Sequence, residues 1–198
     1  MTRSTTFSAP SGSFDADVTL PGDKSLGHRA LIIAAMAEGR SRVGGLSRGE
    51  DIASTQRVLT GLGVGFDGNE IISGGRAAWT PPRHPLDCGN SGTTMRLMAG
   101  ALAPSSFTTS LIGDESLTRR PMRRLVEPLA ALGASVTLSS EGTAPVTITG
   151  RTLTGASVAV PVASAQVRTA VAFAALAASS DTTIDSPPGF RDHTERWL

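Results

Sequence analysis

Apolar runs rich in alanine and leucine recur along the chain, and a polar loop that contains glycine or serine precedes each of them. Three runs predict helices: GDKSLGHRALIIAAMAEG, GNSGTTMRLMAGALA and ASAQVRTAVAFAALAAS. A short segment rich in threonine, serine or valine follows each run and predicts a strand. In the first two copies, a charged loop, a second helix, a glycine and two further short strands follow. The sequence therefore predicts one structural pattern repeated three times.

The second helix of each copy has its own local support. In the second copy, Pro121 fits the first helical position, the apolar residues that follow share one face, and Gly133 ends the helix. In the first copy, two acidic residues lie at the favourable amino-terminal end. In the third copy, Asp192 is a plausible N-cap, but only two turns remain before Leu198. The third copy is therefore predicted to be truncated.

Units of the form strand–helix–strand–helix–strand–strand predict an α/β (α+β) domain with mixed sheets and helices inside. Asp17–Leu20 is strand-like and precedes the first polar loop. We expect a leading segment at residues 1–20 and one domain at 21–198, with repeats at about 21–80, 81–155 and 156–198.

Composition narrows the class of function. Of the 198 residues, 39% are hydrophobic and 18% are charged, which is typical of a globular protein and not of a disordered one. The net charge of +1 argues against bulk capture of DNA or of a membrane surface. No apolar run has the length of a membrane span, and no secretory signal is apparent. The single cysteine fits a reducing compartment, so we expect a cytoplasmic protein.

The first polar loop combines features of an anion site. Pro21–Ser25 places Lys24 and a hydroxyl where free N–H groups and the helix dipole favour negative charge. Arg29 follows one turn later, on the same side as Ser25. Asp23 and Val18 occupy the positions where a nucleotide P-loop needs glycine, so that motif is excluded. A solvated turn capped by Ser25 is the alternative for this loop alone.

The second loop, Cys88–Arg96, is stronger evidence for a ligand site. Its glycines allow a close approach of the backbone, and its asparagine, serine and threonines offer hydrogen bonds in several directions. Arg96 follows this loop as Arg29 follows the first, and the repeated layout disfavours a simple tight turn. The third loop, Ala163–Gln166, adds a hydroxyl and an amide, although alone it would be only an N-cap.

The arginine cluster Arg119–Arg124 allows three interpretations. Arg120, immediately before a proline, fits a bidentate clamp for a carboxylate or phosphate. Arg123 and Arg124 are expected on the solvated face. A nucleic-acid patch is poorly supported because no aromatic stacking platform accompanies the cluster.

The remaining chemically active side chains favour structural roles. Asp192 and His193 form either an acid–base pair or a helix cap, and the cap is the commoner arrangement. His28 and His84 have no partners at metal-ligand spacing, so no metal site is expected. Cys88 has no base near it in the sequence and is expected to be structural.

Taken together, the loops resemble the 5-enolpyruvylshikimate-3-phosphate synthases (3-phosphoshikimate 1-carboxyvinyltransferases). The matching stretches follow the family's order over nearly the whole chain: LPGDKSLGHRALIIAAMAEG, SRGEDIASTQRVLTGLGV, DCGNSGTTMRLMAGALA, GDESLTRRPMRRLVEPLAALGA, ASAQVRTAV and RDHTERWL. The resemblance implies a monomeric two-domain enzyme in which each domain is an inside-out barrel of three βαβαββ units. It implies transfer of the enolpyruvyl group from phosphoenolpyruvate to the 5-hydroxyl of shikimate 3-phosphate without a cofactor. This reaction belongs to the shikimate pathway, which leads to chorismate and the aromatic amino acids.

The resemblance also implies roles for individual residues. It assigns the shikimate 3-phosphate side to Lys24, Ser25, Arg29, Ser164, Ala165, Gln166 and Arg191. It assigns the phosphoenolpyruvate side to Lys24, Asn90, Gly92, Thr93, Arg120 and Gln166. The resemblance also implies that Lys24 lies between the two substrates and is a catalytic residue.

Two departures from the family pattern change the expectation. Ala165 stands where many members have a second serine, which removes one hydroxyl from the phosphate loop. In the family, the acid–base aspartate, a partner glutamate and several cationic groups come from the second domain, which also contains the strand of residues 1–20. We therefore expect the chain 1–198 to bind substrate but not to turn over by itself.

Two alternatives remain. UDP-N-acetylglucosamine enolpyruvyl transferases share the fold, but they have Lys-Asn where this chain has Lys24-Ser25, and Cys88 does not match their loop cysteine. A non-catalytic module that binds a phosphorylated acid is the other alternative. In each case the expected partners are small anions, with no nucleic acid and no membrane.

Overall fold

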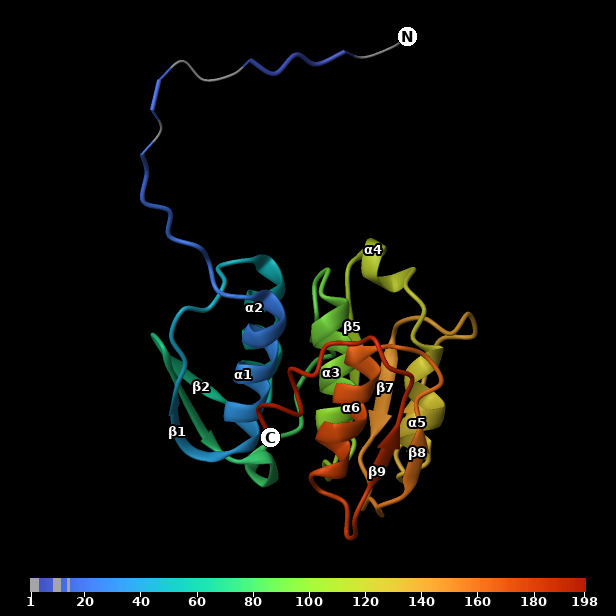
Figure 1. Ribbon diagram of the computed structural model, residues 1–198. Helices are drawn as coiled ribbons and strands as arrows, with labels where there is room; N and C mark the ends of the chain where they lie inside the picture. The colour runs from blue at the N-terminus through green and yellow to red at the C-terminus, as the bar shows by residue number, and fades with distance from the viewer. Residues whose placement is uncertain (1–3, 9–11, 14) are drawn as a thin grey trace.

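The computed structural model describes residues 4–8, 12–13 and 15–198, and the helices and strands between residues 24 and 185 form successive α/β units (Figure 1). The elements of the first unit are α1 (Lys24–Met36), β1 (Glu38–Arg42), α2 (Glu50–Gly61), β2 (Gly65–Asp67) and β3 (Glu70–Gly74), followed by the 3-10 turn η1 (Arg76–Ala78). The second unit contains β4 (Leu86–Asp87), α3 (Gly92–Leu102), β5 (Thr108–Ile112), α4 (Glu115–Thr118), η2 (Arg123–Leu125), α5 (Val126–Ala130), β6 (Ser135–Thr137) and β7 (Val146–Thr149). The third contains β8 (Ser157–Ala159), α6 (Ala165–Ala175) and β9 (Thr183–Asp185). The predicted repeating pattern is confirmed.

Each unit has its own sheet. The order in the second unit is β4-β5-β7-β6, with β4 parallel to β5 and the other pairs antiparallel. The first unit has the same antiparallel part, β1-β3-β2, and the third has the parallel pair β8-β9. In the second unit, β4 lies beside β5 at the edge of the sheet. Among the described residues, no strand lies beside β1 in the corresponding position of the first unit. The expected strand at Asp17–Leu20 is not formed here, and Val18 and Leu20 are 73% and 80% exposed.

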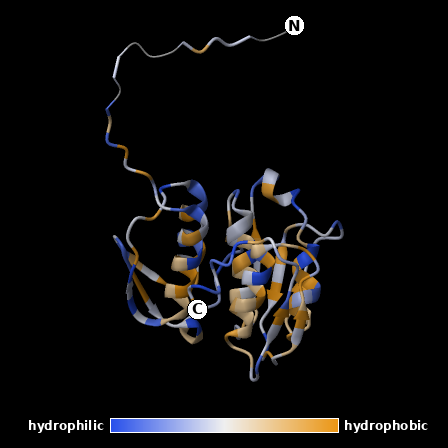
Figure 2. Ribbon diagram, viewed as in Figure 1, coloured by the Kyte–Doolittle hydropathy of each residue, from blue (hydrophilic) through white to orange (hydrophobic). Residues whose placement is uncertain are grey.

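Helices α1, α3 and α6 lie inside, between the sheets, as the prediction required (Figure 1). Figure 2 shows hydrophobic residues concentrated on these helices and on the neighbouring strands. Leu31, Met98 and Phe173, one from each helix, are fully buried. Helix α3 approaches α6 so closely that a Cβ at Gly100 would lie 1.9 Å from the carbonyl oxygen of Ala170. Glycine is therefore required at this position, despite its low helix propensity.

The second helix of the second unit differs from the prediction. Pro121 does not begin a helix, because the expected helix is shortened to η2 and α5, and α4 ends before Pro121. The N–H of Met122 donates to the carbonyl oxygen of Gly142 at 2.9 Å, so contact with the β6–β7 loop replaces a first helical turn. The expected apolar face is nevertheless buried, as Leu125 and Leu129 show, and Arg123 and Arg124 are exposed as predicted.

The predicted cap at Asp192 is wrong, and the alternative of a cap at Ser25 is not observed. Residues 193–197 form turns, so Asp192 does not begin a helix. Helix α1 is capped by Asp23, whose side chain accepts from the N–H of Leu26 at 2.8 Å, and Ser25 is already within the helix.

A chain of buried polar side chains connects the first two units. His28 Nδ1 lies 2.7 Å from Thr55 Oγ1, and Thr55 Oγ1 lies 2.7 Å from Thr94 Oγ1. Thr94 in turn contacts Ser91, the N-cap of α3, at 2.8 Å. His28 Nε2 is buried without a hydrogen-bond partner among the described residues. Burial lowers the pKa of His28 from 6.5 to about 4, because a charged imidazole there would lose its hydration.

We predict that His28 makes the fold sensitive to mild acid. The unfolded chain takes up the proton near pH 6.5 and the folded chain only near pH 4, so a fall in pH through this window favours unfolding. Between about pH 7 and pH 5, the free energy of unfolding should fall by about 2 kcal/mol more in the wild type than in His28→Asn. Urea denaturation at the two pH values measures the difference, and His84 and His193 are common to both proteins. An equal decrease in the free energy of unfolding of the wild type and of His28→Asn would contradict the prediction.

Candidate functional site

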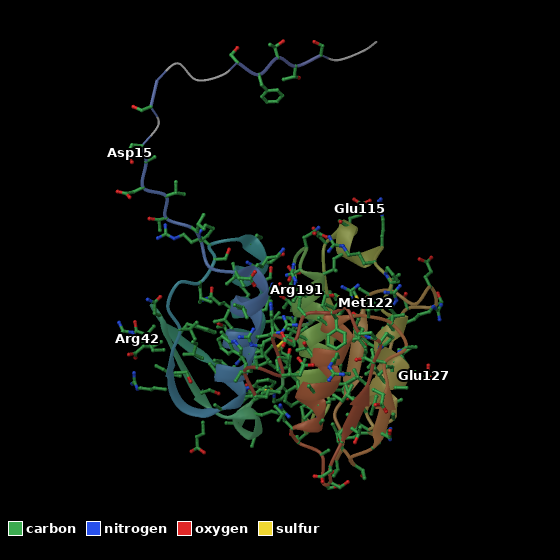
Figure 3. The ribbon with its side chains drawn as sticks, in the orientation of Figure 1. Asp15, Arg42, Glu115, Met122, Glu127 and Arg191 are labelled. Carbon is green, nitrogen blue, oxygen red and sulfur yellow. The ribbon has the colours of Figure 1, made fainter. Side chains whose placement is uncertain are left out.

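Three helices begin around one cavity. It has a volume of about 180 Å³ and is lined by Ser25, Arg29, Thr93, Ala165, Gln166, Arg191 and His193. These residues come from the first two turns of α1, from the first turns of α3 and α6, and from the segment that follows β9. Figure 3 shows Arg191 between the part of the fold that contains α1 and the part that contains α3. Because each helix amino terminus carries partial positive charge, the cavity favours an anion.

Short polar side chains define where the three helices begin. Besides Asp23 on α1, Ser91 accepts from the N–H of Thr94 at 3.1 Å on α3, and Ser164 accepts from the N–H of Val167 at 3.4 Å on α6. The hydrogen bond from Leu26 lowers the pKa of Asp23. Ser164 therefore caps its helix in this structure and does not line the cavity.

Arg29 is the most constrained cation of the site. It is only 2% exposed, and burial lowers its pKa. Its Nε donates to Thr194 Oγ1 at 2.7 Å, its Nη1 to the carbonyl oxygen of Ser25 at 3.0 Å, and its Nη2 to Thr169 Oγ1 at 2.8 Å. No described carboxylate forms an ion pair with it. Glu195 and Asp23 act on its charge only from a distance, so an anion in the cavity would be its direct countercharge.

Gln166 is held in one orientation by two neighbours. Arg96 Nη1 donates to Gln166 Oε1 at 2.9 Å, and Gln166 Nε2 donates to Thr93 Oγ1 at 2.9 Å. Arg96 also donates to the carbonyl oxygen of Pro121 at 3.1 Å, and burial lowers its pKa. Arg96 therefore orients the Gln166 side chain through a hydrogen bond and does not itself line the cavity.

Lys24 lies next to the cavity but does not line it. Its Nζ lies 2.6 Å from Asp51 Oδ2, across the amino ends of α1 and α2, and its side chain is 56% exposed. The partner Asp51 was not anticipated as part of the site, because its sequence position suggested only a favourable helix terminus.

A second group of predicted residues flanks the cavity at the start of α3. Asn90 Nδ2 donates to Asp114 Oδ2 at 2.7 Å and lowers the pKa of that carboxyl, while Arg120 Nη2 donates to Asn90 Oδ1. A Cβ at Gly92 would lie 2.8 Å from Arg96 Nη1 and 3.4 Å from Arg120 Nη1, so a larger residue there would displace the flexible ends of these two arginine side chains.

His193 was expected to belong to a helix cap, but it lines the cavity, and its Nδ1 is buried without a described hydrogen-bond partner. Thr169 and Thr194, which bind Arg29, were also missed. They lie 140 and 165 residues from Arg29 in sequence, so no local spacing could have revealed them.

Other candidate chemistry finds less support. A larger hollow of about 560 Å³ includes Arg57, Arg83 and His84, but Glu50 already pairs with Arg57 at 2.7 Å. Cys88 is fully buried, which raises the pKa of its thiol and disfavours the nucleophilic thiolate. Within the described part of the chain, no cluster of His, Cys, Asp or Glu could hold a metal, and no helix is long and apolar enough to cross a bilayer.

Comparison with known proteins agrees with this arrangement. The family model of EPSP synthase (3-phosphoshikimate 1-carboxyvinyltransferase) matches residues 9–198. The 3-phosphoshikimate 1-carboxyvinyltransferase of Halorhodospira halophila is 46% identical over 196 residues, which cover 96% of this chain and 44% of the relative. That of Limosilactobacillus fermentum is 47% identical over 192 residues, which cover 95% of this chain and 44% of the relative.

A solved EPSP synthase from Acinetobacter baumannii has the same fold over 91% of this chain and 42% of its own, with a TM-score of 0.86 and 40% identity. The chain spans less than half the length of these relatives. Since sequence and fold both match over nine-tenths or more of its residues, the chain belongs to the EPSP synthase family.

Proposed function

We propose that this chain provides the shikimate 3-phosphate half-site of an enzyme that transfers the enolpyruvyl group from phosphoenolpyruvate to the 5-hydroxyl of that substrate, with release of phosphate. The observation that carries the proposal is Arg29, a buried cation with no described carboxylate partner, beside the amino ends of three helices. A small acid with two anionic groups would match this distribution of positive charge.

The two anionic groups of shikimate 3-phosphate can be assigned to opposite sides of the cavity. Its carboxylate would contact Arg29 and Ser25 on α1. Its phosphate would contact the amino end of α6, where Ser164 and Ala165 lie, together with Arg191. The Gln166 amide, already oriented by Arg96, would contact both substrates. The methyl group of Ala165 leaves the phosphate more dependent on backbone N–H groups and Arg191.

Phosphoenolpyruvate would bind on the flank next to α3. Arg120, fixed by Asn90, would contact its phosphate, and the backbone at Gly92 and Thr93 would approach it closely. Lys24 would lie between the two substrates, where its ammonium group could exchange Asp51 for a substrate oxygen. An exposed ion pair is weak enough to permit this exchange.

The domain boundary is part of the proposal. Residues 21–198 would form the shikimate-phosphate domain, and the leading segment up to residue 20 would join a sheet of the second domain. The high exposure of Val18 and Leu20 supports this, because strand residues with apolar side chains normally pack against a partner.

We predict that Arg29→Gln weakens the binding of shikimate 3-phosphate to purified 1–198 at least about tenfold, since a hydrogen-bonded charge is lost. The matched control is Arg151→Gln, which removes an exposed arginine near the carboxyl end of α3 and should leave affinity within about twofold. Isothermal titration measures both, with phosphoenolpyruvate and UDP-N-acetylglucosamine as comparison ligands. The proposal would be contradicted if Arg29→Gln bound shikimate 3-phosphate as tightly as the wild type does, or if the wild type bound UDP-N-acetylglucosamine more tightly than shikimate 3-phosphate.

We also predict that 1–198 binds its substrate without completing the transfer. No carboxylate is among the residues that line the cavity, and the family's acid–base aspartate belongs to the second domain. A phosphate-release assay with both substrates should therefore give only the background rate. Turnover at a rate typical of an enzyme would show that the described half-site is catalytically sufficient and would overturn this prediction.

A further inference from the structure

Thr194 connects the site to a segment distant in sequence. It is 2% exposed, and its hydroxyl contacts both Arg29 Nε, at 2.7 Å, and Thr169 Oγ1, at 2.5 Å. Arg29 is on α1, Thr169 is on α6, and Thr194 is in the turns after β9. One hydroxyl therefore joins three parts of the fold behind the cavity.

The donors and acceptors in this group determine the direction of every bond. Thr169 Oγ1 lies 2.6 Å from the carbonyl oxygen of Ala165, which can only accept, so the Thr169 proton goes there. Thr169 Oγ1 then accepts from Arg29 Nη2 and from the hydroxyl of Thr194. Thr194 Oγ1 in turn accepts from Arg29 Nε. Both hydroxyl protons are therefore donated within this group, and both hydroxyl oxygens accept from Arg29. These neutral acceptors fix the plane of the guanidinium.

Arg168, the neighbour of Thr169, holds the rest of the segment. Its guanidinium pairs with Glu195, and its Nη1 donates to the carbonyl oxygen of Ile184 at 3.0 Å and to Ser186 Oγ at 2.8 Å. It also lies over the ring of Phe190, 4.9 Å from the centroid. These contacts leave the side chains of the intervening residues, including Arg191 and His193, at the cavity.

We propose that Thr194 is a positioning residue that fixes the Arg29 guanidinium and, through the same hydroxyl, keeps Arg191 and His193 at the cavity. The inference rests on the proposed function only for the identity of the ligand. Thr194 itself does not line the cavity, so its effect on binding is exerted through Arg29 and the segment.

The test compares two substitutions at one position. Thr194→Val keeps the shape and removes the hydroxyl, and it should weaken binding of shikimate 3-phosphate to 1–198 about tenfold. Thr194→Ser keeps the hydroxyl and should bind within about threefold of the wild type. The matched control is Thr182→Val, because Thr182 Oγ1 is buried without a described partner and no hydrogen bond is lost. A folded Thr194→Val that binds as tightly as Thr182→Val would overturn the inference.

A second measurement needs neither the ligand nor a stable Thr194→Val protein. In the wild type, the Arg29 Nε–H should give a resolved ¹H–¹⁵N NMR signal that exchanges slowly with solvent, assigned by its loss in Arg29→Lys. Rapid exchange would overturn the inference. If that signal is protected and 1–198 does not bind shikimate 3-phosphate, the positioning of Arg29 is retained and the proposed ligand is wrong.

Discussion

The requirement that three helices lie inside the domain with their amino ends at one cavity controls the rest of the site. Helix α3 must approach α6 closely enough to need Gly100, and α1 must be joined to α3 through buried polar contacts from His28 to Ser91. This packing aligns the partial positive charges of the helix ends at a single cavity. An anion is the ligand that such a cavity is best suited to bind.

The same packing buries Arg29 and removes its guanidinium from water, which costs free energy. A buried guanidinium with no directly paired carboxylate among the described residues is normally unfavourable inside a protein, so Arg29 is better explained by a ligand than by stability. Hydroxyl and carbonyl acceptors hold its plane without neutralising its charge. Arg29, which has no direct ion pair among the described residues, therefore remains available to a ligand. Lys24 and Arg120, which already contact Asp51 and Asn90, are placed on the flank.

The repeating pattern and the first two polar loops were predictable, because helix starts, glycine loops and the i, i+4 relation of Ser25 and Arg29 are local features. Ala165 and Arg191 were expected only from the family resemblance. The loss of the first turn of the expected helix at Pro121 was not predictable, since it depends on the hydrogen bond from Met122 to Gly142 across the unit. The same reason explains why the roles of Asp51, Thr169 and Thr194 were missed. Each acts through a partner that lies far away in the sequence and becomes a neighbour only in the folded chain.

The location of the binding site is tested most directly by a residue-resolved NMR titration of ¹⁵N-labelled 1–198 with shikimate 3-phosphate. Binding at the three helix ends should produce saturable shifts of the backbone amide signals at the starts of α1, α3 and α6, together with those of Arg191 and His193. The hollow that contains Arg57 and Arg83 is the internal comparison, and its signals should remain unchanged. Shifts confined to that hollow, or no shifts in a folded protein, would contradict the claim that the three helix ends form the binding site.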